Sequence, residues 1–132
     1  MKKKEWDTKK ADAEFSKFIR ARDGRCMHPQ CPNPNIPEAN LTCSHFWPRD
    51  VWPTRFDPNN CVAACRGCHF YKWENMKQGE YRDYMIRRLG ARKYNAMEKL
   101  VKDYKGGKFS IKHREEIEKC RQYLEKYAAK RA

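Results

Sequence analysis

The sequence predicts a small α+β fold that is mainly helical, in which a zinc site of four cysteines braces a short ββα core. Three observations lead to it. The chain has 132 residues, 39% hydrophobic and 36% charged, so its apolar core must be modest. Two cysteine pairs have metal-ligand spacing, and helical periodicity dominates on both sides of them. We expect one domain over residues 1–132, with an N-terminal helix at 7–22, a zinc-braced core at 26–75 and basic C-terminal helices at 78–129.

The N-terminal helix is predicted over residues 7–22. Phe15, Phe18 and Ile19 fall at helical spacing there, which indicates a stripe that faces the core. Gly24 follows the helix and ends it, because glycine adopts the left-handed conformation that closes helices.

The middle of the chain predicts a β-hairpin that leads into a helix. Residues 26–40 contain four prolines and three asparagines, which indicates a loop around the first cysteine pair. Leu41 to Trp47 is predicted as a strand, and residues 48–59, with three more prolines, as a turn and a short return. We expect the helix to start near Val62, with Asn59 or Asn60 at its beginning.

Three further helices are predicted at about residues 78–89, 91–104 and 111–129, the first of which ends at Gly90. Cys120 belongs to the apolar stripe of the last helix, so it is expected to be a buried free thiol. The apolar positions at helical spacing are Tyr81, Tyr84, Met85, Leu89, Tyr94, Met97, Val101, Ile117, Cys120, Leu124 and Tyr127.

The net charge of +13 is unevenly distributed. Residues 1–25 hold nine Lys and Arg against five Asp and Glu, residues 26–71 hold three against three, and residues 72–132 hold eighteen against nine. Basic flanks around an electrically balanced centre suit a polyanion such as DNA. A solvated, lysine-rich helical surface would have the same composition.

Localisation is expected to be cytoplasmic. The sequence has no apolar run of the length that a membrane span needs, and its first residues lack the apolar segment of a signal peptide. Seven cysteines cannot all pair in disulfides within one chain, so metal-bound thiolates in a reducing compartment fit better.

The four expected zinc ligands are Cys26, Cys31, Cys65 and Cys68. Each pair offers two thiolates from one turn of chain, and two such turns complete a tetrahedral, structural Zn²⁺ site with no open position. Alternatives remain: the thiols at positions 43 and 61 can replace one ligand or be small apolar residues, and a histidine at position 28 lies inside the first knuckle.

A second set of residues suggests hydrolytic chemistry. Phosphodiester hydrolysis needs a base to activate water, a hard cation on the phosphate and a group that fixes the base. His45, Asn60 and His69 can supply these functions. Each also has a plainer interpretation, as a packed strand histidine, a helix cap and a neighbour of the zinc, respectively.

These residues resemble an HNH motif of the ββα-metal (His-Me finger) nucleases, and more closely the NinG/Rap phage recombination endonucleases. The resemblance covers about residues 15–127. It is carried by Phe18-Ile19-Arg20, Arg22-Asp23, Ser44-His45-Phe46, Arg55-Phe56-Asp57, Asn60, Cys65, Cys68, His69, Lys72, Glu80-Tyr81-Arg82, Ile86, Arg88-Leu89-Gly90, Ile111, Glu115-Glu116 and Cys120.

The resemblance implies that His45 is the general base, that Asn60 orients it, and that His69 binds a catalytic Mg²⁺ or Mn²⁺. It implies cleavage of branched DNA, such as Holliday junctions or D-loops, to 5′-phosphate and 3′-hydroxyl ends, for a phage or prophage in a bacterial host. Symmetric cutting of a junction would require two active sites and hence a homodimer. Arg49, Arg55 and Lys72 are candidates for phosphate contact.

The sequence departs from the HNH pattern at Ser44, where many such enzymes have an acidic metal ligand. Asp50 or Asp57 can then complete the cation site, or waters and substrate do so. Family members often carry asparagine where this chain has His69. The alternative function is a non-catalytic, zinc-stabilised module that binds nucleic acid, and a protein-binding zinc module is a third interpretation, which the charge disfavours. The tryptophans at 47, 52 and 73 can stack on splayed bases or pack in the core.

Overall fold

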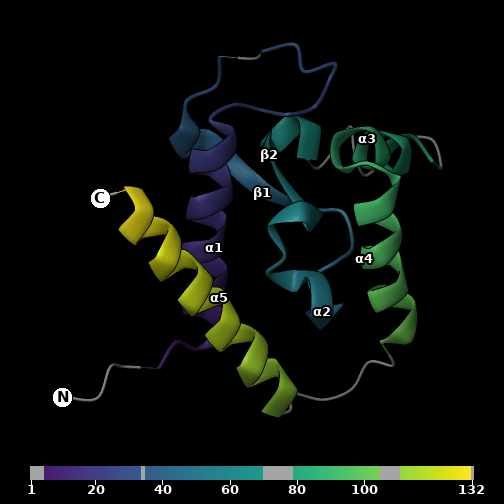
Figure 1. The fold of residues 1–132 in the computed structure, drawn as a ribbon. Coiled ribbons are helices and arrows are strands. Elements are labelled where there is room, and N and C mark those ends of the chain that lie inside the picture. Colours follow the sequence, from purple (N-terminus) through teal and green to yellow (C-terminus); the bar gives the residue numbers. More distant parts are fainter. Residues whose placement is uncertain (1–4, 34, 70–78, 105–110, 132) are drawn as a thin grey trace.

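The computed structural model is mainly helical, with one small antiparallel sheet (Figure 1). It describes residues 5–33, 35–69, 79–104 and 111–131. The α-helices α1 and α5 lie side by side on one side of the two strands, and α3 and α4 lie on the other (Figure 1). The elements are α1 (Thr8–Asp23), η1 (Glu38–Asn40), β1 (Leu41–His45), α2 (Trp52–Arg55), η2 (Pro58–Asn60), β2 (Cys61–Cys65), α3 (Glu80–Leu89), α4 (Ala91–Asp103) and α5 (Ile111–Arg131).

Helix α1 confirms the first predicted helix to within one residue at each end. The side chain of Asp7 caps it by accepting a hydrogen bond from the Lys10 amide at 2.7 Å. Gly24 ends it with φ 68°, a left-handed conformation that strains residues with a Cβ. Phe15 and Ile19 are buried in the core, as the periodicity predicts.

The sheet corrects the predicted helix start near Val62. Residues Cys61–Cys65 form β2, which pairs antiparallel with β1 so that His45 lies opposite Cys61 and Leu41 opposite Cys65. All five residues of β2 are buried, because the strand is covered on both faces. A strand of this kind shows no polar alternation and cannot be distinguished from a buried helix by periodicity. Helical structure begins only after it, over residues 66–69.

The connection between the strands also differs from the prediction. Strand β1 ends at His45 and not at Trp47, and the expected return strand is replaced by the short helices α2 and η2. Proline lies in the first turn of each, where its missing N–H costs no hydrogen bond. The Asp57 side chain caps η2 by accepting from the Asn59 amide at 2.9 Å.

The C-terminal helices confirm the expected positions of three helices, as far as residues 79–104 and 111–131 show them. Gly90, at φ 86°, separates α3 from α4. Met85, Tyr94, Met97 and Cys120 are buried, in agreement with the predicted stripes. None of the helices in the described ranges has the length and apolar character that crossing a bilayer requires.

Charged side chains form hydrogen bonds with backbone groups on the edge of β2 that faces away from β1. Arg22 donates to the carbonyls of Pro58 at 2.8 Å and Cys61 at 2.7 Å. Asp23 accepts from the Ala63 amide at 2.8 Å, and Arg88 reaches the Cys61 carbonyl from α3 at 3.1 Å. The Met27 amide, in the loop after α1, donates to the Ala63 carbonyl at 2.9 Å. These bonds satisfy buried backbone groups of β2 and leave β1 as the strand beside the pocket described below.

Candidate functional site

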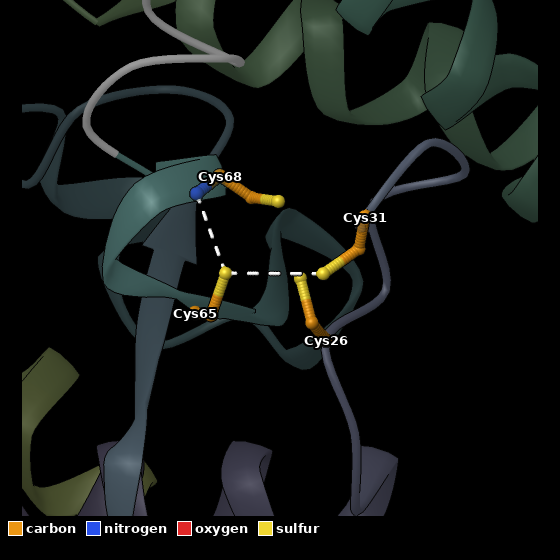
Figure 2. A group of neighbouring side chains, drawn as sticks. All are labelled: Cys26, Cys31, Cys65 and Cys68. Atoms are coloured by element: carbon orange, nitrogen blue, oxygen red, sulfur yellow. Dashed lines mark hydrogen bonds between the residues drawn. The ribbon is translucent and has the colours of Figure 1, made fainter. Parts of the chain in front are cut away.

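The four predicted zinc ligands lie together. The Sγ atoms of Cys26, Cys31, Cys65 and Cys68 are all within 4.8 Å of one another. Figure 2 shows that the first two come from the loop after α1 and the other two from the end of β2 and the turn that follows it. The Sγ atoms of Cys31 and Cys65 are 3.9 Å apart, close to the spacing of about 3.8 Å that tetrahedral Zn–S bonds would give.

The environment of this cluster suits a structural metal such as zinc. The Cys68 amide donates to Cys65 Sγ at 3.4 Å. The thiol pKa values are shifted in different directions: burial raises the pKa of Cys26 and of Cys68, whereas at Cys65 hydrogen bonds from Cys68 and the other thiols outweigh burial and lower the pKa. All seven cysteines lie in the described part of the chain and are free of disulfides. Neither His28 nor the remaining thiols belong to the group, so the four-cysteine set is retained.

His45 lies at the end of β1 with one ring nitrogen held by the backbone. Its Nε2 is 2.9 Å from the Arg55 carbonyl oxygen. Since a carbonyl can only accept, Nε2 carries the proton and Nδ1 carries the lone pair. Burial lowers the pKa of His45 to about 4, so the ring is neutral near pH 7.

Asn60 connects the segments around His45. Its side chain is fully buried. Its Oδ1 accepts from the Trp47 amide at 2.9 Å, and its Nδ2 donates to the carbonyls of Trp47 at 3.0 Å and Thr54 at 3.1 Å. Asn60 thus fixes the loop that carries Arg55, whose carbonyl holds His45. It precedes a strand, not a helix as predicted, so capping of a helix is not its role.

The two arginines of this loop differ in their partners. Arg55 is 12% exposed and forms a bidentate pair with Asp12 of α1, at 3.0 and 2.6 Å. Its Nη1 also donates to the Arg49 carbonyl at 2.8 Å. The guanidinium of Arg55 is therefore engaged within the fold, whereas the Arg49 side chain is 63% exposed. Of the two candidates for phosphate contact, Arg49 is the accessible one.

His69 lies in the helical segment 66–69, beside β1. The hydroxyl of Thr42 donates its one proton to the Ala64 carbonyl at 2.8 Å. Its contact with His69 Nδ1 at 2.9 Å is therefore one in which the imidazole N–H donates. This bond places the lone pair of His69 on Nε2, the opposite tautomer to that of His45.

Both histidines line a pocket of about 730 Å³ along β1. Asn60 is absent from its lining and acts from behind it. The lining residues that the sequence did not suggest include Asp12, Thr42 and Tyr81. No local pattern marks Asp12 or Thr42, and Tyr81 is marked only by the helical stripe and the family resemblance, because contacts between distant parts of the chain bring these residues to the pocket.

Ser44 has a hydroxyl at the position where many HNH enzymes have an acidic metal ligand. It is buried and lies 3.1 Å from the hydroxyl of Tyr81. Among the lining residues in the described ranges, the acidic side chain is Asp12. Asp50 and Asp57 are not among them, and Asp57 is engaged in capping η2.

The tryptophans take part in local packing. Trp47 lies against Phe46 and Tyr94, with ring centroids 4.7 and 5.4 Å away. Trp52 stacks on His113 of α5 at 4.2 Å. The remaining candidates for nucleic-acid contact, Lys72 and Trp73, lie outside the described residues.

Comparison of the chain with family models, with curated proteins and with solved structures gives no match.

Proposed function

We propose that this chain is a metal-dependent DNA endonuclease that hydrolyses phosphodiester bonds in branched recombination intermediates. The observation that carries the proposal is the pair of opposite tautomers in one pocket, with the lone pair on Nδ1 of His45 and on Nε2 of His69. Hydrolysis of a phosphodiester requires one group to take a proton from water and another to hold a cation. Two histidines with fixed and different tautomers match this requirement.

His45 is the proposed general base. In the unliganded pocket its pKa of about 4 keeps it neutral, although a base of so low a pKa takes protons weakly. The negative charge of a bound phosphodiester would raise this pKa toward neutrality. The Arg55 carbonyl holds the Nε2 proton throughout, so Nδ1 accepts the proton of the attacking water.

His69 is the proposed protein ligand of the catalytic cation, through Nε2. When bound, the cation would polarise the scissile phosphate and stabilise charge on the leaving 3′ oxygen. An imidazole ligand suits Mn²⁺ better than Mg²⁺, which prefers oxygen donors. The other coordination positions would come from water and from the phosphate, since Ser44 is bonded to Tyr81.

Arg49 is the proposed phosphate contact beside the base. It is exposed and lines the same pocket as His45. The net charge of +13 supports a polyanionic partner. Selectivity for branched DNA and the phage context are supported by the family resemblance, and a homodimer follows from the two active sites that symmetric cutting would require.

The proposal is tested with wild type and His45→Ala on a synthetic four-way junction and on linear duplex, with and without Mn²⁺ or Mg²⁺. We expect wild type to cut the junction in the presence of the cation, and His45→Ala to lose at least about a hundredfold in rate. The four-cysteine cluster should hold one equivalent of Zn²⁺ in both proteins, because His45 is not one of its ligands. Thr42→Val is a second variant, which keeps His45 intact but removes the acceptor of the His69 N–H; it should require more cation for half-maximal cleavage.

Binding without cleavage by either protein would instead support the alternative, a non-catalytic zinc module that binds nucleic acid. The four-cysteine cluster and the basic charge fit that alternative equally well. Junction affinity measured against salt is an independent check, since phosphate contacts make log K fall linearly with log salt. A flat response would contradict the basic surface as the docking site.

A further inference from the structure

We infer that Cys43, His45 and Cys61 form a second metal site, for a soft divalent cation of the Zn²⁺ class, separate from the four-cysteine cluster. Two thiol sulfurs and an imidazole nitrogen of these residues lie within 4.8 Å of one another. This is one of two such groups of ligand atoms in the described ranges of the chain.

The strand register places the three side chains together. Cys43 and His45 are alternate residues of β1, so both lie on one face of the sheet. His45 lies directly opposite Cys61, which makes Cys61 a diagonal neighbour of Cys43 across the strands. Rigid, paired strands therefore hold the three ligands, and no loop has to move to assemble them.

The three ligand atoms would need to move only slightly closer together to coordinate a tetrahedral ion. Zn–S bonds of about 2.3 Å and Zn–N bonds of about 2.0 Å place ligand atoms roughly 3.5–3.8 Å apart. Changes of side-chain torsion can draw atoms that lie within 4.8 Å to this spacing. Two thiolates and one imidazole select soft or borderline cations over Mg²⁺ and Ca²⁺.

The site would have an open fourth position. Three protein ligands with a water in the remaining place are typical of accessible zinc sites, while four thiolates are typical of structural ones. Cys43 and His45 both line the pocket, from which a water can complete the coordination. Packing of a small apolar residue accounts for the fully buried Cys61, but not for the half-buried Cys43 thiol beside two other ligand atoms.

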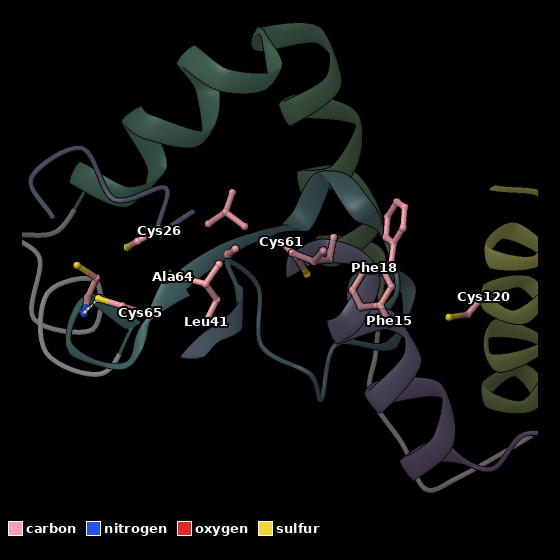
Figure 3. Close-up of a cluster of buried hydrophobic side chains, with 12 residues drawn as sticks. Phe15, Phe18, Cys26, Leu41, Cys61, Ala64, Cys65 and Cys120 are labelled. Carbon is pink, nitrogen blue, oxygen red and sulfur yellow. Dashed lines mark hydrogen bonds between the residues drawn. The ribbon is translucent and has the colours of Figure 1, made fainter. Parts of the chain in front are cut away.

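Strand β2 thereby carries a ligand of each site at its two ends. Cys61 is its first residue and Cys65 its last, so the two sites would be separated by about 13 Å of extended chain. Figure 3 shows Cys65 near Cys26 at one end of the strand and Cys61 toward Phe18 at the other.

A metal in the second site would compete with the proposed catalysis. With Nε2 of His45 bonded to Arg55, the nitrogen left for a cation is Nδ1, which is also the proposed proton acceptor. A bound soft cation would therefore block the base. This consequence rests on the proposed function, whereas the metal site itself does not.

The site is tested by Co²⁺ titration of the full-length protein, after Zn²⁺ has been loaded to one equivalent. We expect wild type to bind one further equivalent of Co²⁺, with the thiolate-to-cobalt absorption of a site that contains sulfur ligands. Cys43→Ala and, independently, Cys61→Ala should lose that absorption and keep the first Zn²⁺. Cys120→Ala, which removes a thiol outside both groups, should keep both.

The second site would be overturned if wild type bound no Co²⁺ beyond its one equivalent of Zn²⁺. It would also be overturned if Co²⁺ bound without the thiolate-to-cobalt absorption, or if that absorption were unchanged in Cys43→Ala. Binding of Co²⁺ to His69 alone gives no such band and is thereby distinguished. If junction cleavage is established, excess Zn²⁺ should inhibit wild type at least about tenfold more than Cys43→Ala at equal DNA binding. Absence of cleavage in every protein would contradict the proposed function and leave the metal stoichiometry as an independent result.

Discussion

The Arg55 carbonyl accepts a hydrogen bond from Nε2 of His45 at 2.9 Å, across ten residues of chain that contain helix α2. The position of the last carbonyl of one short helix thus determines which nitrogen of the histidine carries the proton and which carries the lone pair. The buried side chain of Asn60 holds this helix in place: it accepts a hydrogen bond from the Trp47 amide and donates one to the Thr54 carbonyl. The site residues are therefore coupled through backbone groups.

His45 should remain the neutral Nε2–H tautomer between about pH 5.5 and 8, since burial lowers its pKa to about 4. In the unfolded chain it takes up a proton near pH 6.5, so the free energy of unfolding should fall as pH drops from about 6.5 toward 4, by up to roughly 3 kcal/mol. Long-range ¹H–¹⁵N correlation spectra report the tautomer directly. A His45 resonance that titrates near pH 6.5 would contradict the burial. His45→Gln should flatten this part of the stability profile.

Asn60→Ala should lower the free energy of unfolding by about 2–4 kcal/mol, because it leaves the Trp47 amide and two carbonyls without their buried partner. Urea denaturation monitored by circular dichroism measures the loss. Asn59→Ala is the matched control, since Asn59 is only half-buried, and it should cost less than about 1 kcal/mol. Equal costs for the two variants would show that the buried amide is not what holds the loop.

Substitution of Arg55 should lower the stability of the fold, whereas substitution of Arg49 should weaken DNA binding. Arg55→Ala should destabilise the fold by about 2 kcal/mol, because it leaves Asp12 without its bidentate partner. Arg49→Ala should change stability by less than about 0.5 kcal/mol, since its contact with Asp12 is long and exposed, yet it should weaken junction binding. Thermal melting and binding titrations on the same preparations distinguish the two effects. Weakened binding by Arg55→Ala alone would reverse their roles.

Removal of metal from the four-cysteine cluster should lower the melting temperature by more than about 10 °C, because in a metal-stabilised small domain the binding free energy is part of the folding free energy. Cys65→Ser should have the same effect, and Cys120→Ala should retain the metal. Metal analysis combined with thermal melts measures both properties. A chelator-treated protein that melts like the untreated one would exclude a structural role.

The helices and the four-cysteine cluster could be predicted because each depends on a local pattern. Helix α1 followed from a stripe of three apolar residues and a terminating Gly24, and the cluster followed from two short cysteine spacings. Strand β2 could not be predicted, because Cys61-Val-Ala-Ala-Cys65 is buried on both faces and so lacks alternation.

The pocket was predicted only in part. His45 and His69 could be named, and the structure brings them to one pocket. Their tautomers depend on the Arg55 carbonyl and the Thr42 hydroxyl, which are contacts that no spacing encodes. Arg55 and its partner Asp12 are 43 residues apart in the sequence. The sequence alone therefore could not show that Arg55 is engaged within the fold while Arg49 is exposed.

The four-cysteine cluster also has a consequence for chain entropy. Cys31 and Cys65 are 34 residues apart, and the segment between them contains β1, α2, η2 and almost all of β2. A metal bound by both residues closes that segment into a ring. By analogy with a covalent cross-link, the ring lowers the conformational entropy of the unfolded chain, which stabilises the fold by about 4 kcal/mol. His45 and Asn60 both lie inside the ring. A metal in the cluster would therefore limit how far these two residues can separate in the unfolded chain.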